Sequence, residues 1–174
     1  IRQTRLYCLP RWYCHCPYLN LAGSLTNLTD ASGRSITFTY GPRGHVIKAV
    51  DPAGRVILYS YGPRGNLDSV TEPDGGIWHF TYDPNHLLVA ITSPDANTTL
   101  NTYDSSGRVI SQTNPIGAVT TFTYSGDNFS SSGGTTTITF TDGTKTLEHY
   151  TDGALTGITE DAGTSQARTT TYQI

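Results

Sequence analysis

The amino-acid sequence predicts an all-β protein made of tandem repeats of about 21 residues, arranged as a continuous antiparallel meander. Three observations support this class: a strict period, short β-forming runs between turns, and the composition. The period is clearest in a tyrosine column with a spacing of 21 residues, which consists of Tyr40, Tyr61, Tyr82, Tyr103 and Tyr124. A glycine column and an apolar column share this period: Gly33, Gly54, Gly75 and Gly117, and Leu25, Val46, Leu67, Leu88 and Val109. A fixed period of this length is typical of repeat architectures.

The unit of residues 45–65 shows the strand and turn pattern best, as HVIKAV, DPAG, RVILYSY and GPRG. Its two runs are rich in β-branched and aromatic residues and are bounded by Pro/Gly turns, as successive strands are. In the DPAG turn, Pro52 presets φ at the second position, Asp51 accepts backbone N–H groups, and Gly54 tolerates positive φ. Because no helix lies between the runs, the simplest connection is antiparallel.

The second strand of each unit carries two aromatic residues two positions apart, so both side chains are expected on one face of the sheet. These pairs are Phe38/Tyr40, Tyr59/Tyr61, Phe80/Tyr82 and Phe122/Tyr124, with Asn101/Tyr103 as the weakest member. Successive tyrosines are expected roughly 10 Å apart, because an apolar first strand lies between them.

The period divides the chain into three parts. Residues 21–127 hold five regular repeats. Residues 128–174 hold strand-like runs separated mainly by Asp-Gly turns, which we interpret as two degenerate repeats of the same sheet, with a separate small β-domain as the alternative. Residues 1–20 are rich in cysteine and aromatic residues and follow none of the columns, so we expect a cap or a linker.

The composition excludes several partners. Charged residues make up 14% of the chain, and tyrosine and threonine replace the usual helix formers. With a formal net charge of −3 and no basic stripe, nucleic-acid binding has no electrostatic support. No apolar run approaches the roughly 18 residues of a membrane span. The segment after Ile1 lacks the apolar core of a secretory signal, so we expect a removed leader or a longer parent chain.

Candidate catalytic groups share no spacing that catalysis requires. None of the histidines has the spacing from a serine or cysteine that a nucleophile and its base would show. They are scattered along the chain as His15, His45, His79, His86 and His149. The aspartates fall at turns, where hydrogen bonds to the backbone explain them. No spacing supplies the converging oxygens of a calcium site. We therefore predict no enzyme activity, no cofactor and no metal.

The cysteines are Cys8, Cys14 and Cys16. With His15 they could bind zinc as three thiolates and one imidazole, but the Cys-x-Cys gap is tighter than usual. We expect disulfide chemistry instead. Because one of three cysteines stays unpaired within the chain, the alternatives are one internal bridge with an inert thiol, or a disulfide between neighbouring subunits.

Glycosylation sequons begin at Asn27, Asn97 and Asn128. Such triplets arise readily by chance in a chain rich in Asn, Ser and Thr. Asn97 and Asn128 fall at predicted turn or loop positions, where a glycan is accommodated most easily. These two asparagines are therefore the stronger candidates for modification.

The repeat residues resemble the YD, or Rhs, repeat family, whose unit has a GRL-like start, a TDPxG turn and a YxYDxxG end. The matching stretches are DPAGRVILYSYGPRG, EPDGGIWHFTYDPNH and TYDSSGRVISQTNPIG, within residues 25–126. The aspartate after the tyrosine is present as Asp83 and Asp104 but is replaced by Gly41 and Gly62 in the first two units. The resemblance implies a sheet that spirals into a hollow shell, as in bacterial Rhs and toxin-complex proteins and in animal teneurins.

Two functions fit these features, and both predict a secreted or cell-surface protein. The first is a non-catalytic wall segment of a YD/Rhs-type shell or similar scaffold, with adjoining repeats of a longer chain as partners. The alternative is a self-assembling filament or adhesion subunit, because a short array has open edges that recruit strands. The run 167–174, with Arg168 as its one charge, is a candidate strand donor. A carbohydrate-binding module using Trp78, Tyr59 and Tyr61 is a weaker third hypothesis.

Overall fold

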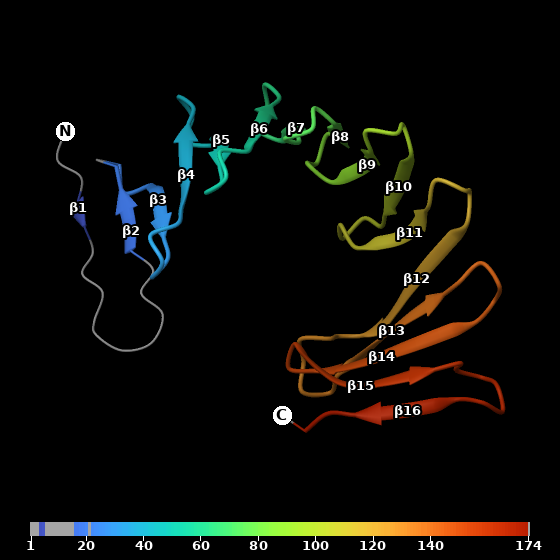
Figure 1. Ribbon diagram of the computed structural model, residues 1–174. Coiled ribbons are helices and arrows are strands. Elements are labelled where there is room, and N and C mark those ends of the chain that lie inside the picture. Colours follow the sequence, from blue (N-terminus) through green and yellow to red (C-terminus); the bar gives the residue numbers. More distant parts are fainter. Residues whose placement is uncertain (1–3, 6–15, 21, 174) are drawn as a thin grey trace. The chain divides into compact units, whose positions relative to one another are not determined.

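The computed structural model describes residues 4–5, 16–20 and 22–173, and these residues form strands and turns (Figure 1). In chain order the strands are β1 (Thr4–Arg5), β2 (Cys16–Leu19), β3 (Leu25–Thr29), β4 (Ser35–Tyr40), β5 (Val46–Val50), β6 (Val56–Tyr61), β7 (Leu67–Thr71), β8 (Ile77–Tyr82), β9 (Leu88–Thr92), β10 (Thr98–Tyr103), β11 (Val109–Thr113), β12 (Val119–Gly126), β13 (Gly134–Thr139), β14 (Lys145–Thr151), β15 (Ala154–Glu160) and β16 (Arg168–Thr171). Across these described ranges, no helix is long and apolar enough to cross a membrane.

Each strand is hydrogen-bonded to the next strand along the chain, so the order of the sheet is the order of the sequence. The pairings are antiparallel, which confirms the predicted all-β meander. The chain divides into two units, of which the first comprises Ile1–Phe80 with Thr92–Ala96 and the second Thr81–Ile91 with Asn97–Ile174. Within the second unit, β12 to β16 lie side by side as successive neighbours, coloured gold to red in Figure 1.

The hairpins close through one recurring turn. In Asp51–Arg55, the Asp51 N–H donates to the Arg55 carbonyl at 3.0 Å and the Gly54 N–H donates to the Asp51 carbonyl at 3.0 Å. Gly54 has a φ of 80°, which makes this a type I turn followed by a glycine bulge. The same two bonds recur in the turns that start at Asn20, Asp30, Gly41, Gly62, Glu72, Asp83, Asp104, Asn114 and Phe140. One local turn chemistry therefore sets the register of most hairpins.

Two turns place a residue with a Cβ where the others have glycine, since His86 has a φ of 67° and Ala96 a φ of 60°. We expect Ala96→Gly to raise the free energy of unfolding by about 1 kcal/mol, because the left-handed region is strained for alanine. The midpoint of urea denaturation measures this change. The reverse control is Gly54→Ala, whose added Cβ would meet no atom within 4 Å, so its cost is conformational strain alone. If the urea midpoint of Ala96→Gly were equal to or below that of the parent, Ala96 would not be strained.

One face of the first unit carries an apolar row that crosses the strands. Cross-strand pairing joins Phe38 to Ala49 and Ala49 to Ile57, and further along it joins Tyr59 to Val70. Among the described residues, Ala49 is the one hydrophobic side chain that counts as buried, with 9% of its surface exposed. The row therefore belongs to a sheet in which most apolar side chains remain partly exposed to solvent.

The start of the sheet extends into the segment predicted to be a cap or linker. Strand β2 pairs with β3, with a register irregularity between Tyr18 and Leu19. The same irregularity occurs at the corresponding positions Thr39/Tyr40 and Ser60/Tyr61. The assignment of residues 1–20 to a separate part stays a prediction, but β2 follows the local geometry of the repeats.

Candidate functional site

The repeated tyrosines are bonded to the repeated apolar residues, in an arrangement we call the tyrosine clip. A clip is a hydrogen bond from a tyrosine hydroxyl to the backbone carbonyl of the residue 15 positions earlier. The clips and their donor–acceptor distances are Tyr40 to Leu25 at 2.7 Å, Tyr61 to Val46 at 2.9 Å, Tyr103 to Leu88 at 2.6 Å and Tyr124 to Val109 at 2.6 Å. Each clip joins the last residue of the second strand, or one near its end, to the first residue of the strand before it. It therefore closes the hairpin at the end opposite the turn.

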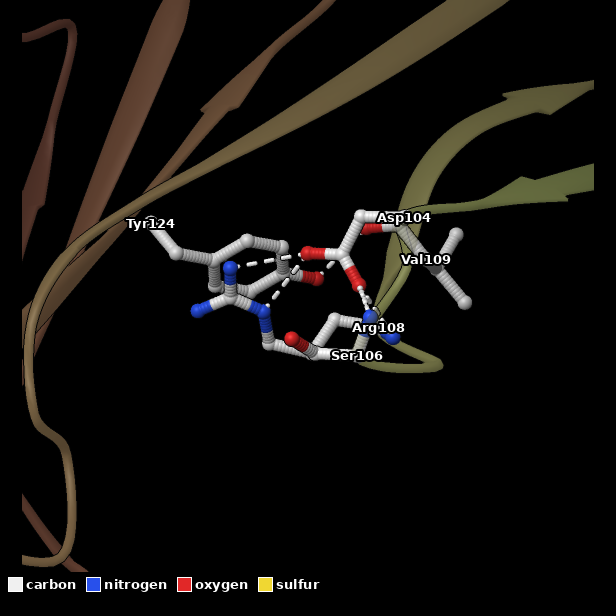
Figure 2. Close-up of polar contacts among 5 residues, drawn as sticks. All are labelled: Asp104, Ser106, Arg108, Val109 and Tyr124. Carbon is white, nitrogen blue, oxygen red and sulfur yellow. Dashed lines mark hydrogen bonds and ion pairs between the residues drawn. The ribbon is translucent and has the colours of Figure 1, made fainter.

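In two clips, the residue just before the carbonyl also covers the tyrosine ring. The guanidinium of Arg108 lies 4.5 Å from the ring centroid of Tyr124, which is a cation–π contact. The imidazole of His45 stacks on Tyr61 with ring centroids 4.6 Å apart and an angle of 18° between the rings. Figure 2 shows the first of these, with the guanidinium in front of the ring and the hydroxyl directed toward Val109. The clip thus holds the tyrosine by its hydroxyl and its ring.

A turn aspartate holds the same arginine. Asp104 Oδ1 accepts the backbone N–H groups of Ser106 and Arg108, both at 2.9 Å. Asp104 Oδ2 accepts Nε and Nη2 of Arg108, both at 2.8 Å (Figure 2). The pairs Asp30/Arg34 and Asp51/Arg55 repeat this geometry. One carboxylate therefore orders the turn and, in the case of Asp104, aligns a guanidinium with a tyrosine ring.

These hydrogen bonds predict a loss of stability in acid. The Arg108 backbone N–H, followed by its guanidinium, lowers the pKa of Asp104. The Arg55 backbone N–H and guanidinium lower the pKa of Asp51 in the same order, whereas for Asp30 the guanidinium of Arg34 lowers the pKa most, followed by the Arg34 backbone N–H. A depressed carboxyl pKa contributes stability above the unfolded value of about 3.9, and this contribution is lost as the pH falls through the folded value. The denaturation midpoint should therefore fall as the pH drops below about 4.

The matched comparison is the triple variant Asp30→Asn, Asp51→Asn and Asp104→Asn. Asparagine keeps the backbone bonds, because Asn114 accepts the N–H groups of Ile116 and Ala118 at 3.1 and 2.9 Å in an equivalent turn. Between pH 5 and pH 2, the denaturation midpoint of the variant should depend less on pH than that of the parent. This range brackets the ordinary carboxyl pKa of about 4. Equal slopes for the parent and the variant would show that these carboxylates do not govern the acid response.

The predicted cysteine site lies mostly outside the described residues. Cys8, Cys14 and His15 fall outside them, and Cys16 is the first residue of β2. The disulfide assignment therefore stays a prediction. Across the part of the chain that the structure describes, no group of His, Cys, Asp and Glu residues is arranged to hold a metal ion.

The sequon asparagines lie in three different settings. Asn27 is within β3, where its Oδ1 accepts the Thr29 hydroxyl at 2.6 Å. Asn97 is exposed just before β10. Asn128 is half-buried, and its Nδ2 donates to Thr136 Oγ1 at 3.4 Å. Asn97 is therefore the most accessible, and glycosylation of each stays a prediction.

The last strands depart from the clip. The hydroxyl of Tyr150, which lies in the part interpreted as two degenerate repeats, donates to the carboxylate of Glu148 at 2.8 Å. His149 lies beside Thr135, with Nδ1 3.2 Å from its hydroxyl oxygen. Glu148 was not among the residues predicted from the sequence to be functional. The one signal that could have singled it out is its place two residues before a repeat-like tyrosine, on the same strand face.

Antiparallel hairpins, each closed by a turn at one end and in several cases by a tyrosine clip at the other, define a structural protein of tandem β-repeats. The chain matches the Teneurin YD-shell family over residues 15–159 and belongs to that family. This match confirms the resemblance to YD repeats. The chain is accordingly a structural, shell-type repeat segment.

Solved structures share the fold. TcdB2-TccC3 without its hypervariable C-terminal region is 18% identical, with a TM-score of 0.60 over 90% of this chain and 10% of that chain. The Photorhabdus luminescens Tc holotoxin pore is 18% identical, with a TM-score of 0.58 over 90% of this chain and 9% of that chain. This chain therefore spans about a tenth of their length. A search of curated proteins found no match.

Proposed function

We propose that the chain is a non-catalytic wall segment of a YD-type shell or a similar extracellular scaffold. The observation that carries this proposal is the tyrosine clip, which repeats with one geometry along the chain. Each clip contributes about 1 kcal/mol, the net value of one hydrogen bond. Because the bond lies within a hairpin, hairpins can be added without new tertiary contacts. Such a unit builds an extended wall.

The apolar surface of the sheet favours a wall over an isolated domain. Leu58 and Leu100 keep 46% and 48% of their surface exposed, and Ile77 keeps 42%. A sheet of this kind needs further surfaces or strands to cover its apolar side chains. Adjoining repeats of a longer chain would supply them. The toxin structures that share the fold are many times longer, which supports the same arrangement.

The alternative function is a self-assembling filament or adhesion subunit, and strand β16 favours it. All four residues of Arg168–Thr171 are exposed, and β16 pairs on one side with β15. An exposed edge with few charges recruits another strand. Pairing of this edge with a second copy would be head-to-tail, and such contacts build filaments when they do not close.

Light scattering and negative-stain microscopy of the intact natural protein separate the two functions. Compact particles of one or a few chains support the wall, whereas long regular particles support the filament. Thr171→Lys places a charge on the edge strand and should abolish filaments. The matched control is Thr123→Lys, an exposed position within the interior strand β12, which should leave them intact. Turnover in a hydrolase panel that disappears on substitution of His149 would contradict the non-catalytic assignment.

A further inference from the structure

The second unit carries a pocket of about 370 Å³ where the regular period ends. Strands β12, β13 and β14 form its floor, and the loop of residues 127–133 forms one wall. Four aromatic rings and one carboxylate dominate the lining: Phe122, Tyr124, Phe129, Tyr150 and Glu148.

Strand register places the carboxylate in the aromatic floor. Tyr124 pairs with Thr136 and Thr136 pairs with Glu148, so the three side chains form one row across the sheet. Tyr150 is two residues beyond Glu148 and shares its face. Its hydroxyl donates to Glu148 Oε2 at 2.8 Å, which orients the carboxylate. Thr136, between Tyr124 and Glu148 in this row, has 7% of its surface exposed.

The wall of the pocket is held by backbone bonds and by missing side chains. The Gly153 N–H donates to the Asn128 carbonyl at 2.8 Å, and the Asp152 N–H donates to the Ser130 carbonyl at 3.1 Å. A Cβ at Gly153 would lie 3.1 Å from the ring of Phe129. These bonds and the absence of a side chain at Gly153 let the loop fold onto the turn between β14 and β15. Phe129 lies beside Gly153 with 82% of its surface exposed.

The charge in this pocket is not balanced within the described residues. Their ion pairs join aspartates to arginines in turns, and none of them includes Glu148. The carboxylate of Glu148 accepts instead the neutral hydroxyl of Tyr150. The ring of Tyr124 already binds one guanidinium, that of Arg108, at 4.5 Å. A carboxylate that lines a pocket together with aromatic rings attracts a cation by direct charge, and the rings can add cation–π interaction.

We propose that this pocket binds the guanidinium or ammonium group of a basic side chain presented by another polypeptide. The aromatic rings would contact the apolar stem and the face of the cation, and Glu148 would accept its N–H groups. A neutral sugar would match the rings but would leave the carboxylate without a charge partner. The proposal rests on the pocket and holds whether the chain is a wall or a filament subunit.

The direct test is a titration of the full chain with N-acetyl-L-arginine amide, followed by chemical-shift changes in its NMR spectrum. N-acetyl-L-citrulline amide has nearly the same shape without the charge and serves as the neutral probe. We expect saturable binding of the arginine probe with a Kd in the range of about 1 mM, and at least about fivefold weaker binding of citrulline. Shifts should centre on the amides of the lining residues Thr136, Glu148 and Tyr150. Added salt should weaken the binding.

Two variants test the residues. Glu148→Gln should weaken binding of the arginine probe about tenfold, whereas Glu160→Gln, the same charge change at an exposed position of β15, should not. Phe129→Ala removes an exposed ring and should weaken binding without affecting the fold. Equal affinity for arginine and citrulline would overturn the proposal, as would unchanged binding by Glu148→Gln. Binding of an uncharged oligosaccharide in place of the arginine probe would also overturn it.

Discussion

Gly133→Ala will destabilise the chain by about 3 kcal/mol, the largest effect that we expect from a single substitution. Gly133 has a φ of +73°, and an added Cβ would lie 2.5 Å from the carbonyl oxygen of Tyr150. Bonds from the Gly153 N–H to the Asn128 carbonyl at 2.8 Å and from the Asp152 N–H to the Ser130 carbonyl at 3.1 Å join the loop of residues 127–133 to the turn after β14, so the loop cannot move aside without breaking them. Urea denaturation followed by circular dichroism measures the loss.

The matched control for this substitution is Gly143→Ala. Gly143 has a φ of +85°, but a Cβ there would meet no atom within 4 Å. Its substitution should cost about 1 kcal/mol, which is the conformational strain alone. The difference between the two variants isolates the collision with the β14 backbone. Equal costs would show that the loop does not pack against β14 as described.

Tyr124→Ala should lower the free energy of unfolding by about 2 to 3 kcal/mol, and Tyr124→Phe by about 1 kcal/mol. Alanine removes the ring that Arg108 covers at 4.5 Å, together with the hydroxyl that donates to Val109 at 2.6 Å. Phenylalanine removes the hydroxyl alone and leaves the carbonyl without this donor. The difference between the variants separates the ring from the clip. Urea denaturation of both variants under the same conditions provides the measurement.

Tyr172→Ala is the control for the tyrosine substitutions. Tyr172 follows β16 and keeps 45% of its surface exposed, and we expect a change below about 0.5 kcal/mol. Tyr61→Phe offers a second clip in the first unit, where the hydroxyl donates to Val46 at 2.9 Å. It should match Tyr124→Phe. If neither Tyr61→Phe nor Tyr124→Phe changed the free energy of unfolding, the clips would not stabilise the hairpins.

The strands of the regular repeats could be predicted because their chemistry is local. Alternation of β-branched and aromatic residues marks β6, and the DPAG turn needs only Asp51, Pro52 and Gly54 to close. Each repeat provides its own turn and its own strands, so a period of 21 residues is enough to locate them. The family could also be predicted from these residues, because each YD-type motif lies within a single repeat and the period is visible in the spacing of the repeats.

The partner of the tyrosine column could not be predicted. The offset of 15 residues between Tyr61 and Val46 is visible in the sequence, but the acceptor is a backbone carbonyl. Every residue has such a carbonyl, so its role leaves no mark on the side chain at Val46. Only the register of β5 and β6 brings this oxygen within reach of the hydroxyl.

The amino-acid sequence by itself determined the fold class, the repeat length and the positions of the turns, because each depends on interactions between near neighbours. The tertiary structure alone decided how Glu148, Tyr124 and Phe129 come to line one pocket. Tyr124 and Glu148 meet through two successive strand registers, and Phe129 arrives through a loop folded against Gly153. No local pattern encodes such a meeting, since it depends on the pairing of strands and on the space that a missing side chain leaves.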